Sequence, residues 1–164
     1  MKYFKKGDIL LSAFDDIFLD SQEKLDEVIK EEKSYLLLKN YLKNLDWISF
    51  LKECQEIPGA IEILKELKDK DILKGFLLQI NSIEEGQAKA NYIREKGIIL
   101  PIHYALTPQT KSFIYPPNEN IILLDTQIKN TEDWESHGGH AILYDNKIKK
   151  KSKKKINDLS NLLK

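Results

Sequence analysis

The stretch Ile9-Leu10-Leu11-Ser12-Ala13-Phe14-Asp15-Asp16-Ile17-Phe18-Leu19-Asp20 decides the predicted fold. An apolar run of strand type ends abruptly in acidic residues. This pattern is typical of a buried strand of a parallel sheet that carries carboxylates to the edge where its strands end. Ligands bind at that edge in open α/β sheets. Taken alone, the stretch is explained equally well by aspartates that cap or solvate a turn.

Composition sets the bounds within which this prediction stands. The 164 residues suit one domain with a real core and room for a small insertion. Lys plus Arg and Asp plus Glu both number 26, so the zero net charge favours neither nucleic acid nor an acidic membrane as partner. A single cysteine, Cys54, excludes an internal disulfide and a cysteine-based metal site. With no apolar run near the roughly 18 residues of a membrane span, we expect a cytoplasmic protein.

Further along the chain, strand-like apolar runs alternate with helical patterns. The runs cover residues 73–80, 98–106, 121–124 and 141–144. Helices are predicted from Pro58, over residues 84–96 and from Asn130, and a short terminal helix is predicted near residues 156–163. This alternation is the mark of a doubly wound parallel α/β sheet.

The segment 21–57 is too long for a plain connection between a strand and a helix. Its apolar residues recur at helical spacing among Lys and Glu, which predicts two or three amphipathic helices. We interpret it as a small helical cap inserted after the first strand, with residues 1–20 and 58–164 forming the core. The alternative is that these helices only extend the core. The lysine-rich run 147–155 is interpreted as a solvated segment before the terminal helix.

Polar side chains stand where the other predicted strands end. Asn81-Ser82 follows the run 73–80, a loop with Lys111 follows the run 98–106, and Asp125 ends the run that begins at Ile121. Because the carboxyl ends of parallel strands share one edge of a sheet, these groups are expected near the aspartates of the first strand.

The order of these motifs resembles that of the haloacid-dehalogenase-like (HAD) phosphohydrolases. Within them it is most similar to the cytosolic 5'(3')-deoxyribonucleotidases, the type C pyrimidine deoxynucleotidases. The resemblance covers nearly the whole chain. Besides the acidic strand end and the cap, it rests on Ile57-Pro58-Gly59-Ala60, on Leu106-Thr107-Pro108-Gln109-Thr110-Lys111, on Leu123-Leu124-Asp125-Thr126 with Asp133-Trp134, and on Gly138-Gly139-His140-Ala141-Ile142-Leu143. It implies a HAD-like, Rossmann-type sheet with a cap.

The resemblance also implies a chemistry. One aspartate at the end of the first strand attacks phosphorus, and a second, two residues later, protonates the leaving alcohol and then activates water. Mg²⁺ is held by the nucleophile, by the backbone carbonyl of the second aspartate and by an aspartate of the late strand. A Ser or Thr at the middle strand end and a lysine hold the phosphoryl oxygens.

Transferred to this chain, these roles leave the nucleophile missing. Asp15 aligns with the general acid/base, and the nucleophile position falls on Ala13. A shifted register makes Asp15 the nucleophile but puts Ile17 in the acid/base position. Ser82 takes the hydroxyl position. The resemblance thus implies Asp15, Lys111 and Ser82 as catalytic residues.

The metal site implied by the resemblance is also reduced. Its candidate ligands are Asp15 and Asp125, and Thr126 stands where the family usually has another aspartate. Without a carboxylate at position 13, Mg²⁺ binding is possible but weakened, because this hard cation prefers several oxygen ligands.

Three functional hypotheses follow. The first is a pseudo-phosphatase that keeps the nucleotidase fold and still binds a nucleoside monophosphate or another small phosphate, because loss of a nucleophile typically costs on the order of a million-fold in turnover. The second is an active Mg²⁺-dependent phosphomonoesterase of 5'-deoxynucleotidase type in which Asp15 is the nucleophile and Asp16 or Asp20 supplies the proton. The third is a non-catalytic interaction module.

Overall fold

The predicted parallel sheet is present and has six strands among the described residues. The structure is a computed structural model that describes residues 1–30, 34–147 and 154–164. All neighbouring strands pair in parallel, in the order β3-β2-β1-β4-β5-β6. The strands are β1 Ile9–Ser12, β2 Leu73–Ile80, β3 Ile102–Leu106, β4 Ile121–Asp125, β5 His140–Tyr144 and β6 Lys155–Ile156. The chain therefore has a doubly wound α/β sheet.

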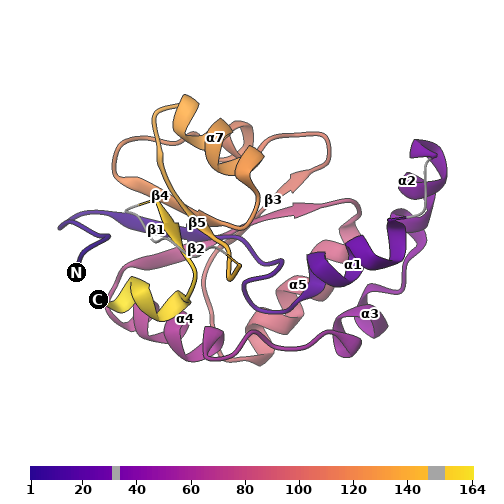
Figure 1. Cartoon of the computed structure of the whole chain (residues 1–164), viewed down its shortest axis with the longest axis horizontal. Coiled ribbons are helices and arrows are strands. Elements are labelled where there is room, and N and C mark those ends of the chain that lie inside the picture. The colour runs from indigo at the N-terminus through magenta and orange to yellow at the C-terminus, as the bar shows by residue number, and fades with distance from the viewer. Residues whose placement is uncertain (31–33, 148–153) are drawn as a thin grey trace.

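Helices cover both faces of the sheet (Figure 1). One face is packed by α4 (Ala60–Asp69), α5 (Ile83–Glu95) and the terminal 3₁₀ helix η1 (Leu159–Leu163). The other face is packed by α6 (Lys111–Ile114) and α7 (Ile128–Ser136). β1 and β4 lie in the middle of the sheet between these layers, so their carboxyl ends meet at its centre.

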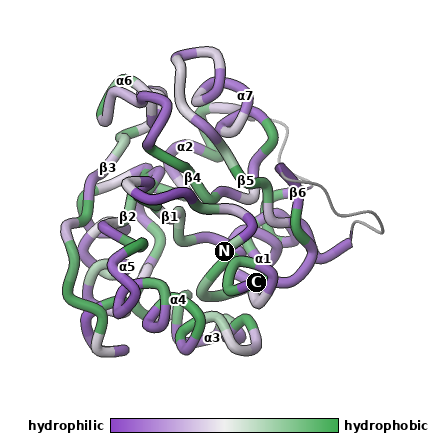
Figure 2. Tube along the Cα trace, turned by 90° about the vertical axis from the view of Figure 1, so that its left-hand side faces the viewer, coloured by the Kyte–Doolittle hydropathy of each residue, from purple (hydrophilic) through white to green (hydrophobic). Residues whose placement is uncertain are grey.

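Alternation along the strands divides the core into two apolar clusters. Leu10 packs into the cluster beneath α4 and α5, whereas its neighbour Leu11 packs with Trp134 beneath α7. Successive side chains of a strand point to opposite faces, so a strand covered on both faces needs apolar residues at every position. Figure 2 shows hydrophobic stretches of the sheet that lie between the two layers of helices.

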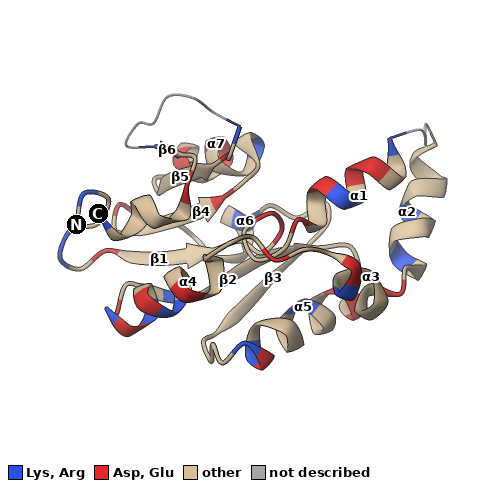
Figure 3. Cartoon of the chain, turned by 60° about the horizontal axis from the view of Figure 1, so that its bottom comes forward, with Lys and Arg blue, Asp and Glu red and all other residues tan. Residues whose placement is uncertain are grey.

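Two or three helices were predicted within residues 21–57, and the described part of this segment has three: α1 (Ser21–Ile29), α2 (Tyr35–Asn44) and α3 (Trp47–Glu53). They lie together at one end of the molecule (Figures 1 and 3). α3 packs on α5 and buries Trp47 and Phe50 in the main cluster, whereas α2 buries none of its residues. Division into a core and a separate cap stays a prediction.

Several predicted boundaries were wrong. β3 begins at Ile102 and not at Ile98, because the preceding Pro101 has no N–H for the ladder. α7 begins at Ile128, so Asn130 lies inside the helix and does not cap it. The terminal helix is of 3₁₀ type, and a two-residue strand, β6, precedes it.

Charged residues of both signs are distributed over α1, α4 and α5 (Figure 3). Most of the lysine-rich run cannot be placed in this picture, since residues 148–153 lie outside the described part of the chain. Among the described helices, none is both long enough and apolar enough to cross a membrane.

Candidate functional site

A cavity of about 350 Å³ lies at the carboxyl ends of the central strands. It is lined by residues that follow β1 and β4, by Gln79 of β2, and by the loop that joins β3 to α6. In the strand order of this sheet, the chain connections reverse direction between β1 and β4. Doubly wound folds bind ligands at that point. Three of the residues predicted to form the site, namely Asp15, Lys111 and Asp125, line this cavity.

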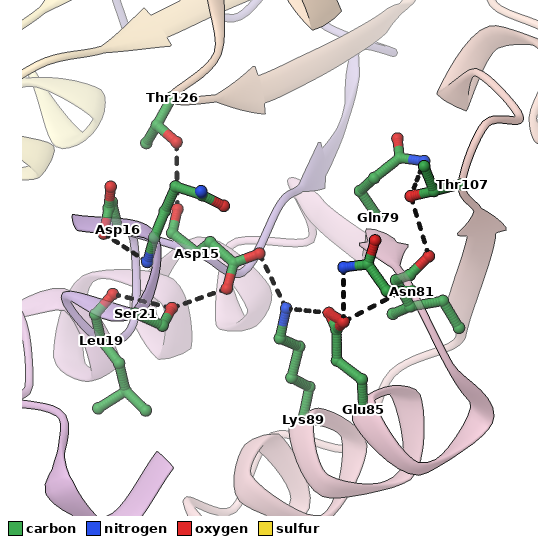
Figure 4. Close-up of polar contacts among 12 residues, drawn as sticks. Asp15, Asp16, Leu19, Ser21, Gln79, Asn81, Glu85, Lys89, Thr107 and Thr126 are labelled. Carbon is green, nitrogen blue, oxygen red and sulfur yellow. Dashed lines mark hydrogen bonds and ion pairs between the residues drawn. The ribbon is translucent and has the colours of Figure 1, made fainter. Parts of the chain in front are cut away.

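The carboxylate of Asp15 is bonded on both oxygens (Figure 4). Oδ2 accepts a hydrogen bond from the Lys89 ammonium at 2.9 Å, and Oδ1 accepts one from the Ser21 hydroxyl at 2.7 Å. The side chain is 24% exposed. A nucleophile or a general acid has to turn a carboxylate oxygen toward its substrate, and here one bond to α5 and one to the start of α1 fix the orientation of the carboxylate.

Lys89 forms the centre of a buried ionic cluster. Its ammonium lies 2.9 Å from Asp15 and 2.7 Å from Glu85, and the Lys89 and Glu85 side chains are each 2% exposed. The rings of Phe14 and Trp47 flank the ammonium at 5.4 Å each. Burial alone lowers the pKa of Lys89, but the two carboxylates and their hydrogen bonds outweigh burial and raise it. Lys89 is therefore a buried cation.

Ser82 does not reach the cavity. Its hydroxyl accepts the backbone N–H of Glu85 at 3.1 Å and so caps the N-terminus of α5. The adjacent Asn81 donates through its backbone and side-chain N–H groups to Glu85 Oε1, both at 3.0 Å. The end of β2 thus faces the Lys89 cluster, and Ser82 is not among the described residues that line the cavity.

Lys111 and Asp125 form the second buried ion pair, at 2.5 Å. Asp125 is the last residue of β4, and both of its oxygens have further donors. Oδ1 accepts the backbone N–H groups of Thr126 at 2.7 Å and Gln127 at 2.9 Å, and Oδ2 accepts the side-chain amide of Asn130 at 3.1 Å. The predicted lysine and the predicted late aspartate therefore bond directly to each other.

These residues do not fit the Mg²⁺ that the resemblance implies. The Asp15 backbone carbonyl, a ligand in that scheme, accepts a hydrogen bond from the Thr126 hydroxyl at 3.2 Å. Asp125 accepts four hydrogen bonds, and Ala13 has no ligand atom in its side chain. Across residues 1–30, 34–147 and 154–164, no three His, Cys, Asp or Glu side chains gather where they could hold a metal ion. No catalytic step is therefore assigned to a metal.

The other two aspartates of the opening stretch bind backbone amides. Asp16 accepts the N–H groups of Gln22 and Glu23, both at 3.1 Å, and Asp20 accepts that of Gln55 at 2.8 Å. Burial raises the pKa of Asp16 to about 6, against the lowering effect of the Glu23 N–H. Asp16 thus caps the start of α1, whereas Asp20, the residue before α1, binds the segment that follows α3.

The sequence prediction missed Lys89 and Glu85 entirely. Their spacing of four residues on a helix is present in the sequence, but such pairs normally lie on a solvated face. The neighbouring apolar residues Ala88, Ala90 and Ile93 were the available signal that this face of α5 is buried. The sequence predicts no contact for Thr126, which stands where the family usually has an aspartate, and predicts only a helix start at Asn130.

Comparison with known proteins supports the fold. The sequence matches no protein-family model and no curated protein. Among solved structures, the chain is similar to a HAD-superfamily hydrolase from Ehrlichia chaffeensis, with 11% identity, a TM-score of 0.53 and coverage of 94% of this chain and 93% of that one. It is also similar to a haloacid dehalogenase-like family hydrolase from Streptococcus pneumoniae, with 12% identity, a TM-score of 0.54 and coverage of 86% of each chain.

A third similar structure is a dehalogenase, with 12% identity, a TM-score of 0.56 and coverage of 94% of this chain and 95% of that one. These matches extend over nearly the whole of each chain and agree in architecture. At this level of identity they establish the fold alone, and any function has to be argued from the residues of the site. The chain therefore has the fold of the HAD-superfamily hydrolases.

Proposed function

We propose that this protein is a pseudo-phosphatase: a HAD-fold protein that lacks the family's phosphotransfer chemistry and binds a small phosphorylated ligand at the carboxyl edge of its sheet. The proposal rests on the residues that directly follow β1. Ala13 stands at the position that aligns with the nucleophile, and the carboxylate of Asp15 is bonded to Lys89 and Ser21.

An active phosphatase that uses Asp15 is the second candidate, and the geometry argues against it. The nucleophile of such an enzyme must face the transferred phosphoryl group and the lysine that steadies it. Lys111 instead bonds to Asp125, while Asp15 bonds to a different lysine, Lys89. To attack phosphorus, Asp15 would have to leave Lys89 buried with one fewer counter-charge.

Ligand binding is favoured over a pure interaction module by the cavity itself. Several uncharged polar residues line it, among them Gln79, Thr107, Gln109, Gln127 and Asn130. Such groups can donate and accept hydrogen bonds with a sugar, a base or phosphate oxygens. Lys129 also lines the cavity, is exposed and provides positive charge for an anion, whereas Lys111 lines it as the partner of Asp125. Nucleoside monophosphates are the first class to test, by inheritance from the resemblance.

Phosphate release tests the loss of catalysis. The natural protein, Asp15→Asn and Ala13→Asp are incubated with an aryl phosphate and a panel of deoxynucleoside monophosphates in the presence of Mg²⁺. We expect no release by the natural protein and no change in Asp15→Asn. Turnover by the natural protein that disappears in Asp15→Asn would establish the active phosphatase instead. Activity gained only in Ala13→Asp would support a scaffold that lost its nucleophile.

Calorimetric titration with inorganic phosphate and the same nucleotides tests the ligand. Lys129 is exposed at the cavity, so Lys129→Gln should weaken binding of a phosphorylated ligand by about tenfold through loss of one charge-assisted contact. Lys39→Gln removes an exposed lysine that does not line the cavity and serves as the matched control. If no phosphorylated compound binds, the interaction module becomes the better hypothesis.

A further inference from the structure

The groups that would hold a divalent cation at the sheet edge are bonded to one another. We propose that a protein-built link, made by the Lys111 ammonium on Asp125 and the Thr126 hydroxyl on the Asp15 carbonyl, replaces the cation and makes the cavity independent of divalent metals. The inference has two parts. That the ligand binds without a metal rests on the proposed function, and that no divalent cation binds here rests on these contacts alone.

The first half of the link saturates Asp125. Each carboxylate oxygen offers about two lone-pair sites. Oδ2 already accepts from Lys111 and Asn130, and Oδ1 accepts from two backbone N–H groups. A cation can ligate this carboxylate only by displacing a donor. Displacing Lys111 would leave a buried ammonium, 3% exposed, without its counter-charge.

The second half of the link closes the carbonyl of Asp15. Thr126 donates its hydroxyl to this oxygen, as Figure 4 shows, and thereby joins the loop after β1 to the loop after β4. In the scheme implied by the resemblance, a cation bridges the same two loops through this carbonyl and a carboxylate. Here the Thr126 hydroxyl alone makes the bridge, while the Lys111 ammonium, from α6, holds the carboxylate of Asp125. The connection between the loops is thus kept without a metal.

Ion pairing points the same way. Each of the three nearest carboxylates already has a cation as partner: Lys111 pairs with Asp125, and Lys89 is shared by Asp15 and Glu85. Ala13 adds no charge. Affinity for a hard dication rises with the number of charged oxygen ligands, and here a dication would have to compete with an ammonium for every one of these carboxylates.

The test is a titration of the full chain with Mn²⁺. Binding is measured by calorimetry and by the loss of the electron paramagnetic resonance signal of free Mn²⁺. We expect no binding to the natural chain. The double variant Ala13→Asp/Thr126→Asp adds two carboxylates and opens the carbonyl, and it should bind Mn²⁺ at least about tenfold more tightly than the isosteric control Ala13→Asn/Thr126→Asn. Circular dichroism verifies that both variants are folded.

Thermal unfolding of the natural chain tests the inference even if the variants do not fold. Its thermal midpoint should be the same in EDTA and in Mg²⁺. One-to-one Mn²⁺ binding that broadens the amide NMR signals of Ala13 and Thr126 would overturn the inference.

Phosphate titration in EDTA and in Mg²⁺ separates this inference from the proposed function. Equal affinity in both conditions supports the metal-independent cavity. Binding that requires Mg²⁺ overturns it and leaves the proposed ligand class in place. Absence of phosphate binding in both conditions contradicts the proposed ligand, and the Mn²⁺ titration then decides the metal inference.

Discussion

The Lys89 ammonium lies 2.9 Å from the Asp15 carboxylate, across 74 residues of chain. This contact joins the loop after β1 to the middle of α5. Its other partner, Glu85, lies one turn earlier on the same helix. The carboxylate that the resemblance assigns to proton transfer is thus part of a buried ionic cluster, which supports a structural role for it over a catalytic one.

Removal of the central cation should destabilise the fold strongly. In Lys89→Met, Asp15 and Glu85 lose their buried counter-charge while most of the side-chain volume is kept, and we expect a cost of about 3–5 kcal/mol in the free energy of unfolding. Urea denaturation measures it. Lys70→Met, which removes an exposed ion pair with Glu66, is the control and should change stability by less than about 0.5 kcal/mol. Equal effects in the two variants would contradict a buried ionic cluster.

Asp16 should make stability depend on pH between about 4 and 6. Its pKa is raised from 3.8 to about 6 by burial, so the folded protein holds this proton more tightly than the unfolded chain. The resulting contribution is fully present below pH 3.8 and is lost as the pH rises through about 6. Asp16→Asn removes the charge, keeps an acceptor for the α1 amides and suits the backbone φ of 59°.

Urea denaturation across this pH range tests the role of Asp16. Asp16→Asn should be close to the natural protein near pH 4 and more stable at pH 7. Asp46→Asn is the opposite-sign control, because the backbone and side chain of Ser49 lower the pKa of Asp46. The effect of that control should be flat from pH 4 to 7. A flat difference for Asp16→Asn as well would refute a raised pKa.

Ser82→Ala separates the observed cap from the predicted phosphate contact. Loss of the hydroxyl that accepts the Glu85 N–H should cost about 0.5–2 kcal/mol of stability. Phosphate affinity should remain that of the natural protein, because Ser82 is not among the described residues that line the cavity. Thermal unfolding and phosphate titration on the same sample measure both. A loss of phosphate affinity without a loss of stability would show that Ser82 contacts the ligand.

Gly139 is expected to tolerate no side chain. A Cβ there would collide with the buried ring of Trp134, a residue of α7, and with the side chain of Pro117. We expect Gly139→Ala to cost about 1–3 kcal/mol through overpacking. Gly86→Ala is the matched control, since the atoms nearest to its Cβ belong to the side chains of Ile80 and Tyr104, at 3.1 Å each. Chemical denaturation should rank Gly139→Ala as clearly the less stable.

Much of the architecture was determined by the sequence itself. Apolar runs such as 73–80 and 121–124 have no polar face, and only strands buried on both faces accept that composition. Their alternation with amphipathic helices therefore predicted a doubly wound sheet. The meeting of Asp15, Lys111 and Asp125 also followed, because parallel strands bring their carboxyl ends to one edge.

The partner of each charged group was decided only by the tertiary structure. Sequence spacing shows that Asp15, Asp125, Lys89 and Lys111 exist, but the choice between possible ion pairs depends on how deeply each helix packs and which side chain is dehydrated. The packing of α5 buries Lys89 and brings it to Asp15, which no local pattern encodes, whereas Lys111 bonds to Asp125. Strand composition thus determined where the site lies, and long-range packing determined which of its groups remain free to react.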